Sequence, residues 1–380
     1  TFLRAASAAS SDDVLSYTLN ESARLLEAQK DWARLSALFK TQVDRQPESP
    51  LVLGWYYWIA RADARAGKTD EAWDFLADHA GQAFGDASRE DVEKMLLLMA
   101  QIASRKKPAS TEAAEAPAST APDAALRDRL HLAADAPVIA QARLRYYQAS
   151  LLRLTRKPAE AVRMLASLGR ELPPAQLSAP ILAESGDALL GTGETEKAAE
   201  FFNTLLTRFP ASTYLDYAYV GLGDLALQRG EPAAALKFYE DAIDIAGAQH
   251  RLREATVGKA RALFALDRLD AAGKLFETIA SAKEWRGEAT ALSLHHLGLI
   301  AVKRGDLPKG IAFFQRVFVS QGRSPEWVAK SYWACGQAFE KLGKSAEAAA
   351  TYREMLRNER IRTFPEIALA TQRLAALATP

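Results

Sequence analysis

A pattern of small and aromatic residues recurs every 37 or 38 residues, and this spacing limits the fold more than any other feature of the 380-residue sequence. A small residue opens each copy, at Gly186, Gly223, Ala260, Gly298 and Gly336. Seven residues later stand Gly193, Gly230, Asp267, Gly305 and Gly343. A second small residue then precedes an aromatic residue by four positions, in the pairs Ala198/Phe202, Ala235/Tyr239, Ala272/Phe276, Gly310/Phe314 and Ala348/Tyr352. Five copies in phase predict a stack of similar units.

Each copy reads as a helix, a short turn and a second helix. Small residues on both helices allow the two backbones to approach closely, and the aromatic side chain fills the space that remains. The turn glycines supply the left-handed conformation that ends a helix at low cost. The "GLG" at 221–223 falls inside a helix, so we interpret it as a packing feature and not as a dinucleotide-binding motif.

This pattern resembles the tetratricopeptide repeat family over residues 137–360. The resemblance implies an all-α fold, a right-handed superhelical solenoid of antiparallel helix hairpins. It also implies a non-catalytic scaffold or adaptor that binds an extended or helical segment of a protein partner in a concave groove.

The sequence of one joint between repeats is similar to that of a smaller group of proteins within the family. The phrase "LLTRFPASTYLDYAYVGLGDLALQRG" is similar to bacterial extracytoplasmic members of the family, the Tol–Pal-associated coordinator and the outer-membrane-assembly lipoproteins. Phe209, Pro210 and Ser212 match the "F/Y-P-x-S" turn that joins units in those proteins, and Phe364-Pro365 begins a similar turn. We therefore expect a bacterial periplasmic or envelope-associated protein, with a cytoplasmic location as the alternative.

In the family, the first helix of each unit lines the groove, at set distances from the small residue. These positions give the candidate partner-binding residues Tyr217, Val220, Asp224, Leu227, Arg261, Phe264, His295, Leu299, Lys330, Trp333 and Gln337. Trp333 and Tyr217 are the expected anchors, because large aromatic side chains dominate binding energy at interfaces. The aliphatic members can instead serve packing of the superhelix.

Three regions follow from the pattern. Residues 1–105 read as degenerate hairpins, with Ala33 and Ala72 as the small residues of two second helices and Gly67 in a turn. Residues 106–125 are rich in Pro, Ala, Ser, Thr and Glu and contain no large apolar residue, so we expect a mobile linker. Residues 126–380 form the regular solenoid, and a lone C-terminal helix in "FPEIALATQRLAALATP" hides its last apolar face.

Composition argues against other functions. Lys and Arg number 48 against 47 Asp and Glu, so the basic excess typical of a nucleic-acid binder is absent. The sequence contains no run of about 18 apolar residues, so we expect no membrane-spanning helix. Cys335 is the only cysteine, and His295 and His296 are the only adjacent histidines; neighbours on a helix point ~100° apart and do not share a metal easily. We expect no catalytic residue, no metal and no cofactor.

Two alternatives to a partner-binding scaffold remain open at this stage. The chain can be a structural subunit of a self-associating or larger assembly, or a regulatory segment of a longer enzyme or sensor. The sequence begins at Thr1 with no apolar signal stretch, and it leaves open whether a signal peptide or lipid anchor precedes it. It also leaves the oligomeric state open.

Overall fold

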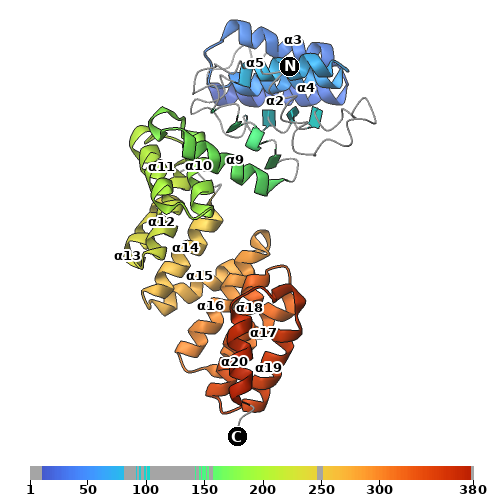
Figure 1. Cartoon of the computed structure of the whole chain (residues 1–380). Coiled ribbons are helices and arrows are strands. Elements are labelled where there is room, and N and C mark those ends of the chain that lie inside the picture. The colour runs from blue at the N-terminus through green and yellow to red at the C-terminus, as the bar shows by residue number, and fades with distance from the viewer. Residues whose placement is uncertain are drawn as a thin grey trace, which may run out of the picture. The chain divides into compact units, whose positions relative to one another are not determined.

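The computed structural model describes residues 11–80, 157–245 and 251–377, together with single positions within 91–102 and 142–153. Every element in these ranges is an α-helix or a short 3₁₀ helix (Figure 1), which confirms the all-α class. None of these helices is long and apolar enough to cross a membrane. The predicted linker, 106–125, and both of its boundaries lie outside the described residues. The chain divides into two compact units, Thr1–Gly221 (unit 1) and Leu222–Pro380 (unit 2).

Unit 1 consists of helices that pack in series on their neighbours. Its first helices are α2 (Asp12–Ala28), α3 (Trp32–Arg45), α4 (Val52–Arg65) and α5 (Thr69–Ala80). The later ones are α9 (Pro158–Glu171), η3 (Pro174–Gln176), α10 (Ala179–Gly191), α11 (Thr195–Arg208) and the first half of α12 (Leu215–Gln228). Contacts between α2 and α3, α4 and α5, and α10 and α11 form the predicted hairpins.

The structure corrects the register of α3. Ala33, predicted to be the small packing residue, is exposed, and Leu35 occupies the equivalent buried position at 0% exposure. Asp31 fixes the helix start, because its side chain accepts a hydrogen bond from the Arg34 amide at 3.2 Å. Lys30 takes the left-handed turn conformation at φ 57° and lies five residues before Leu35, as each turn glycine does before its small residue.

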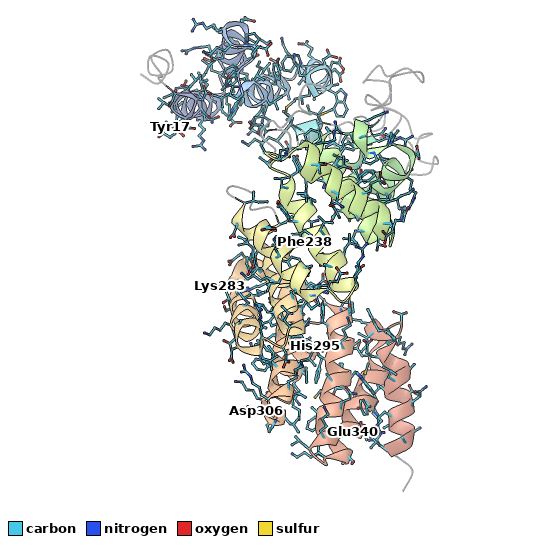
Figure 2. The ribbon with its side chains drawn as sticks, turned by 90° about the vertical axis from the view of Figure 1, so that its left-hand side faces the viewer. Tyr17, Phe238, Lys283, His295, Asp306 and Glu340 are labelled. Atoms are coloured by element: carbon cyan, nitrogen blue, oxygen red, sulfur yellow. The ribbon has the colours of Figure 1, made fainter. Side chains whose placement is uncertain are left out.

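Unit 2 continues the series of hairpins from the second half of α12. Its helices are α13 (Pro232–Asp244), α14 (Leu252–Ala265), α15 (Leu269–Ser281), η4 (Lys283–Trp285), α16 (Glu288–Lys303), α17 (Leu307–Ser320), α18 (Pro325–Lys341), α19 (Ser345–Arg357), η5 (Glu359–Ile361) and α20 (Glu366–Leu377). Asp306 precedes α17 and caps it by accepting from the Lys309 amide at 3.1 Å (Figure 2). The lone helix α20 packs on α18 and α19 and buries Ala370.

The repeat aromatics pack directly against glycines, as the sequence pattern predicts. A Cβ atom built on Gly186 would lie 2.7 Å from the Phe202 ring, and one on Gly336 would lie 2.2 Å from the Tyr352 ring. The same ring also meets a glycine on the first helix of the following repeat. In unit 1 the Phe202 ring lies 2.2 Å from a Cβ built on Gly221. Tyr239 likewise lies against Gly223 and Gly258, so Phe202 and Tyr239 are each held between two backbones that have no side chain at the contact.

Left-handed residues end the first helix of each regular hairpin. Gly193, Gly230, Gly305 and Gly343 have φ between 72° and 86°, and Asp267 has φ 58°. Asp267 thus occupies the turn position that the sequence assigns to it in the copy that begins at Ala260. Aspartate tolerates this conformation better than most residues because its short side chain can hydrogen-bond locally.

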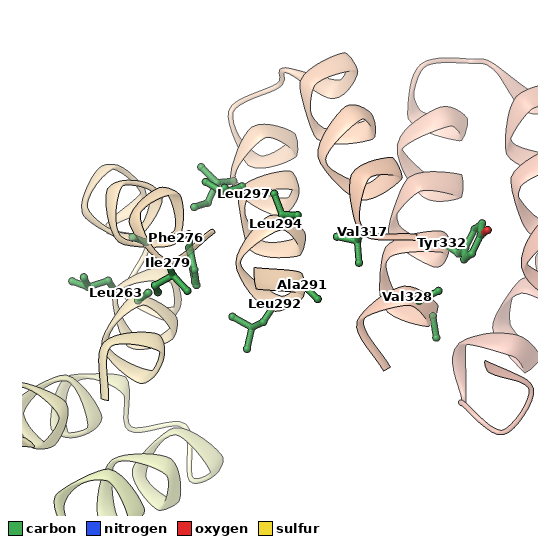
Figure 3. Close-up of a cluster of buried hydrophobic side chains, with 14 of the residues drawn as sticks. Leu263, Phe276, Ile279, Ala291, Leu292, Leu294, Leu297, Val317, Val328 and Tyr332 are labelled. Atoms are coloured by element: carbon green, nitrogen blue, oxygen red, sulfur yellow. The ribbon is translucent and has the colours of Figure 1, made fainter. Parts of the chain in front are cut away.

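Apolar side chains from successive helices fill the spaces between the hairpins of unit 2 (Figure 3). Phe276 and Ile279 of α15, Leu292 of α16 and Val317 of α17 belong to one buried cluster that runs on to Tyr332 of α18. The core is therefore continuous along the unit, and each hairpin depends on its neighbours for burial.

Candidate partner-binding surface

Partly exposed side chains lie along the first helices of unit 2, on α12, α14, α16 and α18. We call this set the first-helix surface; it comprises Asp224, Leu227, Arg261, Phe264, Leu299, Lys330, Trp333 and Gln337. The helices that carry it contact one another, α14 with α16 and α16 with α18. All eight are among the residues that the sequence predicts for the groove.

Charged contacts join one end of the first-helix surface. The Arg261 guanidinium lies 3.5 Å from Asp224 Oδ1, which links α14 to α12. The hydroxyl of Tyr239 donates to the same oxygen at 2.7 Å, and burial together with the Asp224 charge raises the pKa of Tyr239. Asp224 therefore connects the packing aromatic of its own repeat with a cation of the next.

A cationic and aromatic pair marks the other end. Lys330 Nζ lies 4.6 Å from the centre of the Trp327 ring and forms an ion pair with Glu326. One turn further along α18, the partly exposed Trp333 has its ring centre 5.5 Å from that of Tyr352. A partner that reaches this end meets an indole face beside a positive charge.

Between the two ends, the structure buries His295, in contrast to its predicted place on the binding surface. His295 is 6% exposed and its Nδ1 lies 3.0 Å from Ser331 Oγ, which links α16 to α18 (Figure 2). The ring packs near Phe314 and Trp327, with centroids at 5.5 and 5.6 Å. Burial, with the nearby His296 and Lys330, lowers the pKa of His295 to about 3. We therefore assign His295 to packing, because its neighbours cover it.

His296 completes this cluster. Its ring stacks on Phe276 at 4.8 Å and meets the edge of Phe264 at 5.3 Å, and its Nδ1 lies 2.9 Å from the Leu292 carbonyl oxygen. Burial, with the charges of Arg261 and Lys330, lowers its pKa to about 4. Both histidines are therefore neutral at physiological pH.

Tyr217 and Val220 belong to unit 1 and are also buried, at 8% and 4% exposure. Tyr217 forms part of the wall of a pocket of about 340 Å³ between α9 and α10. Asp187 and Leu190 of α10 line the same pocket. Tyr217 thus takes part in packing and in a pocket wall at once.

The polar side of this pocket is a network, missed by the sequence analysis, in which Glu184 and Tyr146 are buried and Arg153 is exposed. Glu184, 5% exposed, pairs with Arg153 at 2.9 Å and accepts from the Tyr146 hydroxyl at 3.0 Å. Burial, together with the charge of Glu184, raises the pKa of Tyr146 well above its ordinary value. The available signal was a carboxylate inside the otherwise apolar run of α10, since a buried acid needs a partner.

Groups suited to catalysis are dispersed. Over the part of the chain that the structure describes, no three His, Cys, Asp or Glu side chains gather closely enough to hold a metal ion. His295 and His296 have ring centres 5.7 Å apart at an angle of 81°, so their nitrogens do not converge. Cys335 is fully buried, and burial raises the pKa of its thiol to about 12.

Cys335 should therefore resist alkylation in the folded protein. Only the thiolate is nucleophilic, and a raised pKa reduces its population at neutral pH. We expect no iodoacetamide adduct at pH 8 under native conditions and full labelling in denaturant, as measured by intact mass. Rapid labelling of the native chain would show that the thiol is accessible and contradict this packing.

The hairpins, their left-handed turns and their glycine–aromatic contacts define an all-α repeat protein. The two repeats at residues 184–212 and 217–249 each match a model of the tetratricopeptide repeat. These two segments are therefore tetratricopeptide repeats. The narrower resemblance to the Tol–Pal-associated coordinator and the outer-membrane-assembly lipoproteins stays a prediction.

Solved structures with a similar chain fold are distant in sequence. NprR, solved in complex with its cognate peptide NprX, has a TM-score of 0.51 at 12% identity and is covered over 81% of its length by 78% of this chain. A tetratricopeptide repeat protein from Parabacteroides merdae ATCC 43184 has a TM-score of 0.47 at 18% identity, over 67% of this chain and 90% of that one. PilW, a type IV pilus biogenesis factor, has 0.46 at 13% identity, over 61% and 98%. The likeness to NprR shows a shared fold. No curated protein matches the sequence.

Proposed function

We propose that the chain is a non-catalytic scaffold that binds a segment of a protein partner on the first-helix surface of unit 2. The observation that carries this proposal is the row of partly exposed rings and charges on consecutive first helices, from Asp224 and Arg261 to Lys330 and Trp333. Aromatic and arginine side chains are enriched where proteins bind one another. The complex of NprR with a peptide supports the proposal, since that protein shares the fold.

The charges of the surface point to a partner of mixed composition. Arg261 and Lys330 are cationic, but each lies beside a carboxylate, Asp224 and Glu326. Such paired charges give register and partner selection more than raw affinity. The affinity is then concentrated in the partly exposed rings, Phe264 and Trp333.

Truncation of Trp333 should separate binding from packing. We expect Trp333→Ala to weaken partner binding by ~2 kcal/mol, because exposed aromatic anchors dominate interface energy. Calorimetric titration with a partner recovered by cross-linking to the wild-type chain measures this loss. Val319→Ala on α17 is the matched control: Val319 is 79% exposed but lies on a second helix, so affinity should stay unchanged. Equal affinities for wild type and Trp333→Ala would place the binding site elsewhere.

We further propose that the protein works at the bacterial envelope. The support is the joint after α11, where Ser212 is buried and its Oγ accepts from the Tyr214 amide at 3.2 Å, so the "F-P-x-S" string forms an ordered turn. Fractionation of cells of the native organism tests the setting: the protein should appear in the periplasmic or membrane fraction. Recovery in the cytoplasmic fraction alone would favour the cytoplasmic alternative.

A further inference from the structure

Unit 2 has a hollow of its own, at the joints between repeats and formed by other residues than the first-helix surface. It has a volume of about 280 Å³ and is lined by Phe318, Gly322, Pro325, Val328, Asn358, Arg360 and Ile361. The α17–α18 joint supplies one side and η5 the other. Val328 and Ile361, at 2% and 0% exposure, lie in its floor, and the partly exposed Phe318 and Pro325 supply its apolar walls.

Local contacts hold the backbone of Arg360 beside this hollow. The Asn358 side chain accepts from the Arg360 amide at 3.1 Å and so holds the first turn of η5. The burial of Ile361 pins the same turn against the protein. Across the hollow, Arg360 Nη1 lies 3.8 Å from a Cβ atom built on Gly322. The exposed guanidinium therefore lies in the wall of this space, opposite the α17–α18 joint.

Neighbouring carboxylates are engaged elsewhere. Glu359 forms an ion pair with Arg362 at 3.1 Å, and Glu326, next to Pro325, forms one with Lys330. Among the residues that the structure describes, Arg360 has no ion-pair partner. The hollow thus offers an apolar floor, one unneutralised cation and the amide group of Asn358, whose oxygen already accepts from the backbone.

We propose that this hollow, the Arg360 pocket, binds the C-terminal residue of a protein chain when that residue is apolar. The Arg360 guanidinium lies in the wall of this space. A ligand that contacts both the guanidinium and the apolar walls must therefore carry a carboxylate very close to an apolar side chain. In a C-terminal residue the two share one Cα atom. An aspartate or glutamate next to an apolar residue in an extended segment would point to the opposite side. Arginine binds carboxylates through two parallel N–H groups, and capture of a chain terminus is a known mode of recognition.

The pocket is separate from the first-helix surface, so the two proposals can fail independently. Its walls come from the end of α17, the start of α18 and η5, and none of them belongs to the first-helix surface. A partner held by its central segment on one surface and by its end in the other would gain affinity through linkage.

A titration with a small probe tests the pocket directly. The full chain, labelled at isoleucine and valine methyl groups, is titrated with N-acetylphenylalanine and with its amide, N-acetylphenylalaninamide. A probe of about 15 non-hydrogen atoms binds in the millimolar range at ordinary ligand efficiency. We expect saturable shifts of the Ile361 and Val328 methyl signals with the acid, and binding at least ~10-fold weaker for the amide.

Matched variants assign the recognition to Arg360. Arg360→Gln should weaken binding of the acid ~10-fold and leave binding of the amide unchanged, and Arg360→Lys should retain part of the preference. Gly322→Leu should weaken both probes, because its side chain would project toward the Arg360 side of the pocket. Arg353→Gln, an exposed arginine on α19 away from the pocket walls, is the control and should bind as wild type.

Three outcomes would overturn the proposal. The first is the absence of shifts at Ile361 and Val328 up to about 20 mM acid, well above the expected range. The second is equal binding of acid and amide. The third is an Arg360→Gln variant of unchanged melting temperature that still prefers the acid. None of these outcomes bears on Trp333, so a failure here leaves the first-helix surface as proposed.

Discussion

Replacing Gly258 with alanine should destabilise the protein by ~3 kcal/mol or more, as expected for overpacking a site that cannot relax. A Cβ atom at this position would lie 2.2 Å from the Tyr239 ring. The ring cannot move away freely, because it also packs against Gly223, where a built Cβ atom would lie 2.7 Å from it, and because its hydroxyl donates to Asp224. The strain must therefore spread into the backbones of α12 and α14. Thermal and urea unfolding measure the loss.

Gly273 provides the matched control on the next helix. It lies within α15, and a Cβ atom there would meet only Ile300 Cδ1, at 3.9 Å, which is ordinary van der Waals contact. Gly273→Ala should therefore stabilise the protein by ~0.5–1 kcal/mol through helix propensity alone. Two glycine-to-alanine changes would thus shift stability in opposite directions. A similar shift for both would refute the close glycine–aromatic contact.

The second large effect is a loss of stability in mild acid, which comes from His295 and His296. Their pKa values fall from 6.5 to about 3 and about 4 on folding, so the unfolded chain binds more protons between these limits. Stability then decreases as the pH falls below about 7 and continues to decrease until the folded histidines protonate. At pH 5, 1.5 units below the unfolded value, each histidine costs ~2 kcal/mol. We expect a loss of ~4 kcal/mol between pH 8 and pH 5.

A single substitution isolates this contribution from that of the carboxylates. His296→Phe keeps a ring between Phe264 and Phe276 but has no group that titrates. The difference in unfolding free energy between pH 8 and pH 5 should fall by about half, ~2 kcal/mol, relative to wild type. Urea unfolding over this pH range measures it. An unchanged pH dependence would mean that His296 is accessible to protons in the folded state.

The repeat pattern predicted the local packing well. The pairs Gly186/Phe202 and Gly336/Tyr352 are in contact as the sequence indicates, and Asp267 takes the left-handed turn position. These features depend on residues within one hairpin, and the glycines have few other reasons to recur at that spacing. The spacing of residues within one hairpin was therefore sufficient to predict these contacts and turns.

The prediction was wrong in the hairpin of α2 and α3, which lacks a turn glycine. Lys30 takes the left-handed position before α3, and Leu35 takes the packing position within α3. Lysine and leucine are not the small residues that mark these positions in the other copies, so the pattern did not reveal the register of α3. We predicted Ala33 as the packing residue because it is small, but the helix start fixed by Asp31 places Ala33 on the exposed side. The cap residue was the better guide, since it fixes where the helix starts.

Burial of candidate binding residues could not be predicted from position alone. His295 stands at a groove position, yet Trp327 and Phe314, both from other helices, cover it. Glu184 finds Tyr146 at a separation of 38 residues and Arg153 at 31. Such contacts depend on how hairpins stack, which the spacing within one hairpin does not specify. Trp333 remains partly exposed, so its predicted role in binding stays open to test.

Hydrogen exchange with and without a bound partner tests the central claim most directly. Besides the second half of α12, the first-helix surface lies on α14, α16 and α18, and the hairpins alternate these three helices with α15, α17 and α19. On partner binding we predict slower amide exchange in peptides from α14, α16 and α18, because contact restrains the helices that carry the surface. Exchange in α15, α17 and α19 should change little. Protection confined to the second helices would contradict the account.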